Sequence, residues 1–390
     1  MKTPANTLKH TITAVIVFTL FLFNVFSTAL AATRTASVTG NWSSTTTWGG
    51  SSVPTSSDDV VVNSGITVTV DANAECNTIT INANSAGSAN GITISDSYTL
   101  TVTGAVSMTA PSSFKTSLIA VNAGTLNAGS ITIHGGSLAT SSLTVSTGSI
   151  NCSGDISFTG GPSGVNLTFT GAGTLNIGGN LGSGATLTAS TGTVNFNSSG
   201  TQTIASYTFN NLTISGTGSI SAAGNLTVNG TLSVSSGSTL NLTSSYVLFG
   251  TLSTITNDGT IKTSYTTGYY SPIPSGKTWS GTVEYAAASG SQTIVAGTYN
   301  NLQLDNTSGT NTAGGILTVN GTLTIPSGGT LSMSSYKLQG TLTTINNSGT
   351  ITTSVYNDAT PIPAGKTWGG TINYDRFMGG QTIVAGTYNN

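Results

Sequence analysis

The chain has 390 residues, of which only 5% are charged, and its formal net charge is −2. An ordinary soluble domain has roughly 25% charged residues, and a nucleic-acid-binding protein needs basic patches to neutralise phosphates. The composition therefore argues against a nucleic-acid partner. It does not indicate disorder, because hydrophobic residues make up 36% of the chain and the net charge is small.

The first 31 residues have the pattern of a secretory signal peptide. Lys2 and Lys9 precede an apolar run at residues 14–25, and small residues follow as far as Ala31. This run is too short to span a bilayer, and no second run of membrane length follows it. We expect cleavage that removes residues 1–31, and a secreted or cell-surface mature chain with no membrane span. An uncleaved N-terminal anchor is the alternative.

Residues 32–108 are expected to form an N-terminal cap and the first coils of a β-solenoid. Helix formers are scarce, and β-branched runs such as residues 66–70 alternate with a period of two, which is typical of half-buried strands. Trp42 and Trp48 are expected to cover the open end of the solenoid. The segment contains, in order, Gly40-Asn41-Trp42, Thr47-Trp48-Gly49-Gly50, Val53-Pro54, Asp58-Asp59-Val60-Val61-Val62 and Gly65-Ile66-Thr67-Val68.

This order of motifs resembles the opening of the extracellular domain named for its eight glycines, and the N-terminal coils of large bacterial surface proteins. The resemblance covers roughly residues 40–105, and the later glycines align poorly after Asp71. It implies a right-handed parallel β-helix, with no activity assigned to the motif itself.

Residues 109–200 repeat a four-residue phrase at a short period. The phrase recurs after 24, 25 and 19 residues, which fits one solenoid coil of about 20 residues with Gly and Asn turns. Alternate Leu, Ile and Val should point inward and stack from coil to coil, and roughly sixteen coils should form the whole rod. The four copies are Gly124-Thr125-Leu126-Asn127, Gly148-Ser149-Ile150-Asn151, Gly173-Thr174-Leu175-Asn176 and Gly192-Thr193-Val194-Asn195.

Two long repeats follow, at residues 201–290 and 291–380, and residues 381–390 begin a third that stops within a phrase. Their motifs resemble the repeats of exported bacterial adhesin-like proteins, which implies a surface repeat protein that continues beyond this sequence. We therefore expect glycans or cell surfaces as partners, and contacts of the rod's ends with another copy or a downstream domain. The recurring phrases include Gln202-Thr203-Ile204, Gln292-Thr293-Ile294 and Gln381-Thr382-Ile383, and Val228-Asn229-Gly230-Thr231-Leu232 with Val319-Asn320-Gly321-Thr322-Leu323.

Few groups in the mature chain suit catalysis, although polysaccharide lyases and glycoside hydrolases on β-helices are the alternative function. The adjacent carboxylates Asp58 and Asp59 should point to opposite faces of a strand, whereas a glycosidase needs two carboxylates facing one cleft. His134, the only histidine after the signal peptide, is expected at a solvated turn. The acidic residues and this histidine have no metal-ligand spacing, so we expect no metal, cofactor or catalytic residue.

Two tryptophans in the long repeats are the candidate ligand site. Trp279 and Trp368 follow Gly-Lys-Thr phrases that lack the first glycine of a phosphate loop. We interpret these segments as turns with the tryptophan packed on the coil, and a carbohydrate-stacking site at both rings is the alternative. Cys76 and Cys152 are the only cysteines, and both a disulfide and two buried thiols are open.

Outward threonines also raise the hypothesis of ice binding, as at Thr67 and Thr69. β-Propensity alone selects threonine at such positions, and the coil length varies too much for one regular threonine face. The sequence therefore predicts a non-catalytic, adhesin-like structural rod.

Overall fold

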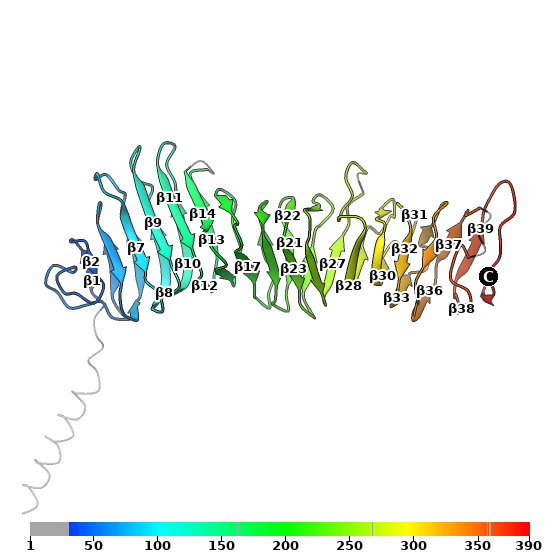
Figure 1. Cartoon of the computed structure of the whole chain (residues 1–390), viewed down its shortest axis with the longest axis horizontal. Coiled ribbons are helices and arrows are strands. Elements are labelled where there is room, and N and C mark those ends of the chain that lie inside the picture. The colour runs from blue at the N-terminus through cyan, green and yellow to red at the C-terminus, as the bar shows by residue number, and fades with distance from the viewer. Residues whose placement is uncertain (1–30, 162–163, 267, 357, 359) are drawn as a thin grey trace, which may run out of the picture.

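The computed structural model describes residues 31–161, 164–266, 268–356, 358 and 360–390. This part of the chain forms an all-β parallel β-solenoid of about 16 turns with coils of about 22 residues (Figure 1). The predicted fold is confirmed, and the coil is slightly longer than the expected 20 residues. The right-handed sense of the coil stays a prediction. The expected signal peptide lies outside the described residues, apart from its last position.

Every strand pairing found among the described residues is parallel, and strands from successive coils pair edge to edge along the rod. The longest sheet contains β1 (Thr33–Ala36), β3 (Asp59–Val62), β5 (Ala74–Cys76), β6 (Thr78–Ile81), β8 (Thr99–Met108), β10 (Thr125–His134), β12 (Ser149–Cys152), β13 (Ile156–Thr159), β15 (Thr174–Ile177), β17 (Thr193–Phe196), β20 (Asn211–Ile214), β23 (Thr231–Val234) and β26 (Thr254–Asn257). A second sheet in the N-terminal half contains β2 (Gly40–Asn41), β4 (Thr67–Val70), β7 (Asn90–Ile94), β9 (Thr116–Val121), β11 (Thr140–Val145), β14 (Val165–Phe169) and β16 (Thr186–Thr188).

The C-terminal half has the same arrangement in a new set of sheets. The largest contains β18 (Gln202–Ile204), β21 (Ser219–Ala222), β24 (Thr239–Asn241), β27 (Thr260–Thr263), β28 (Lys277–Tyr285), β30 (Gly297–Leu304), β32 (Leu317–Val319), β33 (Thr322–Ile325), β35 (Leu338–Gln339) and β36 (Thr344–Asn347). The smaller sheets contain β19 (Thr208–Phe209), β22 (Leu226–Val228) and β25 (Leu248–Phe249); β29 (Thr293–Ile294), β31 (Thr310–Ala313), β34 (Thr330–Ser332), β37 (Thr350–Thr353) and β39 (Thr371–Tyr374); and β38 (Lys366–Thr367) with β40 (Gly386–Thr387).

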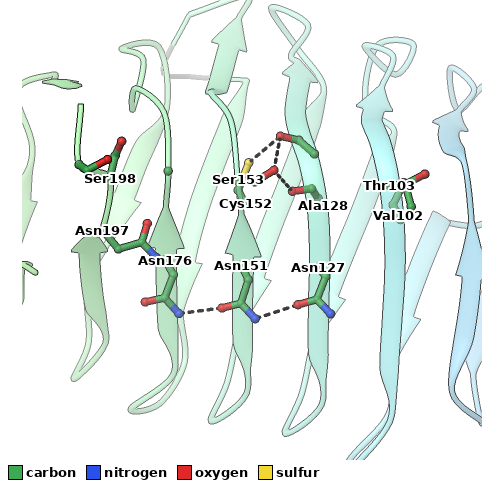
Figure 2. A pocket seen from close by; sticks show the side chains of 13 residues that line it. Val102, Thr103, Asn127, Ala128, Asn151, Cys152, Ser153, Asn176, Asn197 and Ser198 are labelled. Carbon is green, nitrogen blue, oxygen red and sulfur yellow. Dashed lines mark hydrogen bonds between the residues drawn. The ribbon is translucent and has the colours of Figure 1, made fainter. Parts of the chain in front are cut away.

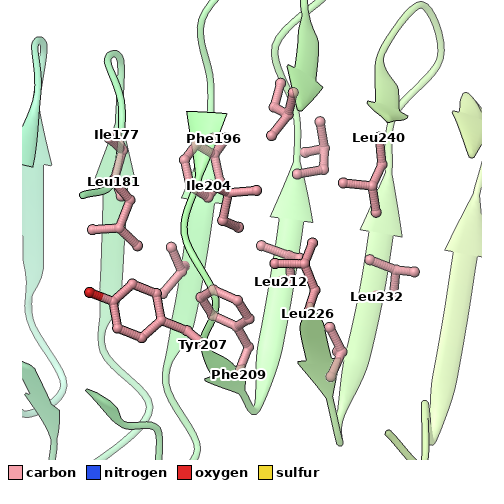
Figure 3. Close-up of a cluster of buried hydrophobic side chains, with 14 of the residues drawn as sticks. Ile177, Leu181, Phe196, Ile204, Tyr207, Phe209, Leu212, Leu226, Leu232 and Leu240 are labelled. Atoms are coloured by element: carbon pink, nitrogen blue, oxygen red, sulfur yellow. The ribbon is translucent and has the colours of Figure 1, made fainter. Parts of the chain in front are cut away.

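The core is a set of columns in which each inward side chain lies on its counterpart in the next coil. Leu126 of β10 aligns with Ile150 of β12, and Ile150 aligns with Leu175 of β15. All three are buried, and each such side chain stabilises the fold by about 2 kcal/mol. Figure 3 shows the same stacking further along the rod, where Phe196, Leu212 and Leu232 belong to successive coils. The predicted inward stacking of alternate apolar residues is therefore confirmed.

The predicted end residues, Trp42 and Trp48, pack against each other in the first coil. Their ring centroids lie 5.0 Å apart in an edge-to-face arrangement, and the indole N–H of Trp48 donates to the carbonyl of Trp42 at 2.8 Å. Both rings are buried. Trp48 is followed by Gly49 and Gly50, whose φ values of 65° and 82° lie in the left-handed region that favours glycine.

Candidate functional site

A groove on the longest sheet is the candidate functional site (Figure 2). It has a volume of about 620 Å³ and runs across five successive coils, over β8, β10, β12 and β15 and the turn after β17. Its lining consists of Val102, Thr103, Asn127, Ala128, Gly129, Asn151, Cys152, Ser153, Asn176, Gly178, Asn197, Ser198 and Ser199. None of these residues carries a formal charge at neutral pH.

A ladder of asparagine side chains forms one wall of the groove. The amide nitrogen of Asn151 donates to the amide oxygen of Asn127, and Asn176 donates to Asn151 in the same way, both at 2.8 Å. Asn195 extends the ladder to Asn176 at 2.8 Å. The three asparagines that line the groove are half-buried, because they lie on the outward face of strands that are paired in register. The ladder therefore repeats the same polar group once per coil.

The floor of the groove is closed by backbone that approaches closely from coil to coil. The register between β8 and β10 shifts at Gly129, where an added Cβ would lie 2.7 Å from the carbonyl oxygen of Thr103. At Gly178 a Cβ would lie 2.3 Å from the carbonyl oxygen of Ser153. Only glycine allows this approach. The small floor residues leave the hollow that the asparagine wall borders.

The thiol of Cys152 lies under the groove and is an inert part of its floor. Its Sγ contacts the carbonyl oxygen of Gly154 at 3.4 Å, and the residue is 2% exposed. Burial raises the pKa of the Cys152 thiol to about 11. Since the thiolate is the nucleophilic form, this cysteine does not supply a nucleophile at neutral pH.

Sequence reasoning missed this groove, although its signal was present. The fourth residue of each short-period phrase is an asparagine, and these are the four asparagines of the ladder. We interpreted the phrase as a marker of coil length alone. The regular asparagine at one outward position was the feature that predicts a polar row on one face.

The structure corrects the alternative of a ligand-stacking site at Trp279 and Trp368. Both side chains are 0% exposed, so neither ring has a free face on which a sugar could stack. Trp279 lies in β28 and is in register with Tyr299 of β30, which is also fully buried. Both tryptophans instead fill the core of their coils, as the packing interpretation predicted.

The lysines of the two Gly-Lys-Thr phrases bind backbone rather than a phosphate. The ammonium group of Lys277 donates to the carbonyl oxygens of Thr251 and Leu252, at 2.5 and 3.4 Å. Leu252 has a φ of 42°, an uncommon conformation for a branched residue. Lys366 makes the equivalent contacts with the next repeat's carbonyls, at residues 341 and 342. Each lysine therefore holds an irregular turn of the preceding coil in place.

The repeated glutamine of the Gln-Thr-Ile phrase is a buried staple between a turn and the preceding coil. The Gln292 side chain accepts from the backbone N–H of Ala287 at 2.8 Å and donates to the carbonyls of Thr263 and Tyr265 at 3.1 and 3.3 Å. Gln202 and Gln381 bond backbone in the same pattern. The phrase recurs because the staple recurs.

The remaining titratable candidates also have structural partners. Asp58 is buried and Asp59 bonds outward to Asn77 at 2.9 Å, so the two carboxylates face apart as predicted. Burial tends to raise the pKa of Asp58, but hydrogen bonds from Thr55 and the backbone and the charge of Arg34 lower it overall.

His134 is half-buried at the end of β10, where its Nδ1 lies 2.6 Å from the hydroxyl of Thr159. The nearby Ser141 hydroxyl donates to the backbone carbonyl of His134, not to the imidazole. This arrangement does not form a nucleophile and base pair.

The two cysteines are free and buried. Cys76 is in register with Val102, Val102 with Ala128, and Ala128 with Cys152. Three steps at the ~4.8 Å strand spacing separate the two cysteines by about 14 Å, beyond the ~7 Å limit for a disulfide. Of the two alternatives that the sequence left open, the structure has the two buried thiols.

Within the described residues, no group of three or more His, Cys, Asp or Glu side chains is placed to hold a metal ion. The same part of the chain has no helix long and apolar enough to cross a membrane. Comparison with known proteins found no matching family model, no matching curated protein and no matching solved structure. The resemblances to adhesin-like repeats and to the eight-glycine domain therefore depend on the short motifs alone.

Proposed function

We propose that the chain is a non-catalytic structural repeat protein, secreted or displayed on a bacterial cell surface, that acts like an adhesin. Its solenoid presents a rigid rod for attachment to surfaces, glycans or other cells. The parallel register from coil to coil supports the rigidity, because each coil is hydrogen-bonded to both neighbours over several faces.

The observation that carries the proposal is the use of the repeated polar residues. Gln292, Lys277 and their counterparts in the neighbouring repeats contact the protein's own backbone. In an enzyme the recurrent polar residues are free to meet a substrate, and in a scaffold they hold the framework. Here they hold turns, which favours a scaffold whose repeats extend its length.

Attachment and turnover can be measured on the same sample. The purified protein is incubated with bacterial cells and with insoluble polysaccharides, and the bound fraction and any new reducing or unsaturated ends are measured together. We expect bound protein and no new chain ends. New chain ends would support the alternative of a polysaccharide lyase or glycoside hydrolase, and an absence of binding to all of these surfaces would remove the adhesin-like function.

A further inference from the structure

The groove on the longest sheet has the dimensions of a site for a linear polymer. It spans five coils from Thr103 to Asn197, and four steps at the ~4.8 Å strand spacing give a length of about 19 Å. Its volume of about 620 Å³ lies within the range of small-molecule and oligomer sites. The hollow runs along the rod, across the strands rather than between two of them.

The asparagine wall offers unused hydrogen-bonding capacity in that direction. Each amide has two N–H donors and an oxygen with two lone pairs, and the ladder at Asn127, Asn151 and Asn176 uses one N–H and one lone pair of each. A second N–H and a second lone pair remain at each half-buried side chain. Figure 2 shows the three amides in a row on successive strands. A donor and an acceptor thus recur once per coil.

We infer that this groove binds one extended chain of an uncharged polysaccharide, which lies along the solenoid axis with about one sugar ring for each coil. The coil spacing of ~4.8 Å is close to the length of one ring in a linear glycan. Sugar hydroxyls both donate and accept hydrogen bonds, so each can use the free N–H and the free lone pair of one amide. This inference rests on the proposed function and names the ligand class for one site of the rod.

The charge of the lining selects against an acidic glycan. The groove has no Lys, Arg or His among its lining residues and no carboxylate, and the Cys152 thiol stays neutral because burial raises its pKa. A uronic acid polymer would lose the hydration of its carboxylates and find no cation. A neutral chain has no such cost.

The form of the groove also distinguishes a glycan from an extended peptide. Peptides that bind as strands need an unpaired sheet edge, and other peptides need apolar pockets for their anchors. The strands β10, β12 and β15 are each paired on both sides. The apolar members of the lining, Ala128 and Cys152, are at most 5% exposed. The accessible surface is therefore polar along its length.

The test uses the purified full chain and isothermal titration with linear neutral hexasaccharides, namely β-1,4-linked glucose, mannose and xylose oligomers. An oligogalacturonate of equal length is the charged comparison. Ser153 has an exposed side chain in the middle of the groove, so Ser153→Phe blocks the groove and leaves the ladder intact. Asn151→Ala removes the central amide. Asn346→Ala is the matched control, because Asn346 is an exposed asparagine on β36 outside the groove.

We expect at least one neutral hexasaccharide to bind with a Kd of about 1 mM or lower, and the monosaccharide and the oligogalacturonate to bind far more weakly. Ser153→Phe and Asn151→Ala should each weaken binding by about tenfold or more, and Asn346→Ala should leave it unchanged. If Asn151→Ala does not fold, Ser153→Phe alone decides.

Three results would overturn the inference: no neutral hexasaccharide binds, Ser153→Phe binds like the wild type, or a neutral Gly/Ser-rich peptide binds where the sugars do not. Attachment to cells that Ser153→Phe leaves unchanged would contradict the groove's role and leave the proposed function standing. Loss of attachment in the wild type as well would contradict the proposed function itself.

Discussion

Replacing Gln292 with leucine should cost about 3 kcal/mol of folding free energy or more. The substitution keeps the side-chain volume similar but leaves three buried backbone groups unpaired, the N–H of Ala287 and the carbonyls of Thr263 and Tyr265. Each unpaired buried group costs about 1 to 3 kcal/mol. Gln292 is 1% exposed, so water has no access to these groups in the folded protein.

Gln381 provides a matched control within the same chain. Its side chain accepts from the N–H of Arg376 at 2.9 Å and donates to the carbonyls of Thr353 and Val355 at 2.8 and 3.3 Å. This site is partly exposed, and water can take over the bonds that the amide makes. We therefore expect Gln381→Leu to cost less than about 1 kcal/mol.

Urea unfolding measured by far-UV circular dichroism gives the two free energies, and hydrogen exchange of the coil around residues 263–292 shows whether the loss is local. Solenoids can unfold in parts, so the exchange data decide whether a two-state treatment holds. Equal effects of the two substitutions, or an effect of Gln292→Leu below about 1 kcal/mol, would refute the staple's role.

The other predictions concern titratable groups. Burial raises the pKa of the Cys76 thiol to about 12 and of the Cys152 thiol to about 11, so a thiol reagent at mildly alkaline pH should label neither in the folded protein and both in denaturant; labelling of the folded protein would contradict their burial. The pKa of Asp58 is lowered on folding, so its stabilisation is present above the unfolded pKa of about 3.9 and is lost as the pH falls through the folded value; Asp58→Asn should lower the Tm at neutral pH and reduce its fall in acid, and an unchanged profile would argue against this. Lys277→Met should cost about 1 kcal/mol, because it removes a charge-assisted contact with two carbonyls at a partly exposed site; urea unfolding measures it, and no change would show that the turn at Leu252 holds without the ammonium.

The fold could be predicted from the sequence because its signals are local and repeated. Alternation of β-branched and polar residues shows which side chains point inward, as at Ile79 and Ile81 of β6, and a recurring phrase shows that successive coils stack. The coil length was underestimated because the four short-period phrases average fewer residues than coils elsewhere in the rod.

The site could not be predicted in the same way, because it depends on which outward residues of different coils come into register. The groove forms where the asparagines align across β10, β12 and β15 and where the bend at Gly129 leaves space beside them. Trp279 shows the opposite case, since a large amphipathic ring in a sequence does not reveal whether a neighbouring coil covers it. In this chain Tyr299 of the next coil lies against that position.

The most direct test of the account is the binding of the full chain to an insoluble neutral polysaccharide at low and high salt. A rod with only 5% charged residues and an uncharged groove should bind equally well between about 0.05 and 0.5 M NaCl, since few charges are present to be screened. The account predicts a constant bound fraction and no new chain ends. Binding that collapses over this range of salt, or release of soluble sugar, would contradict it.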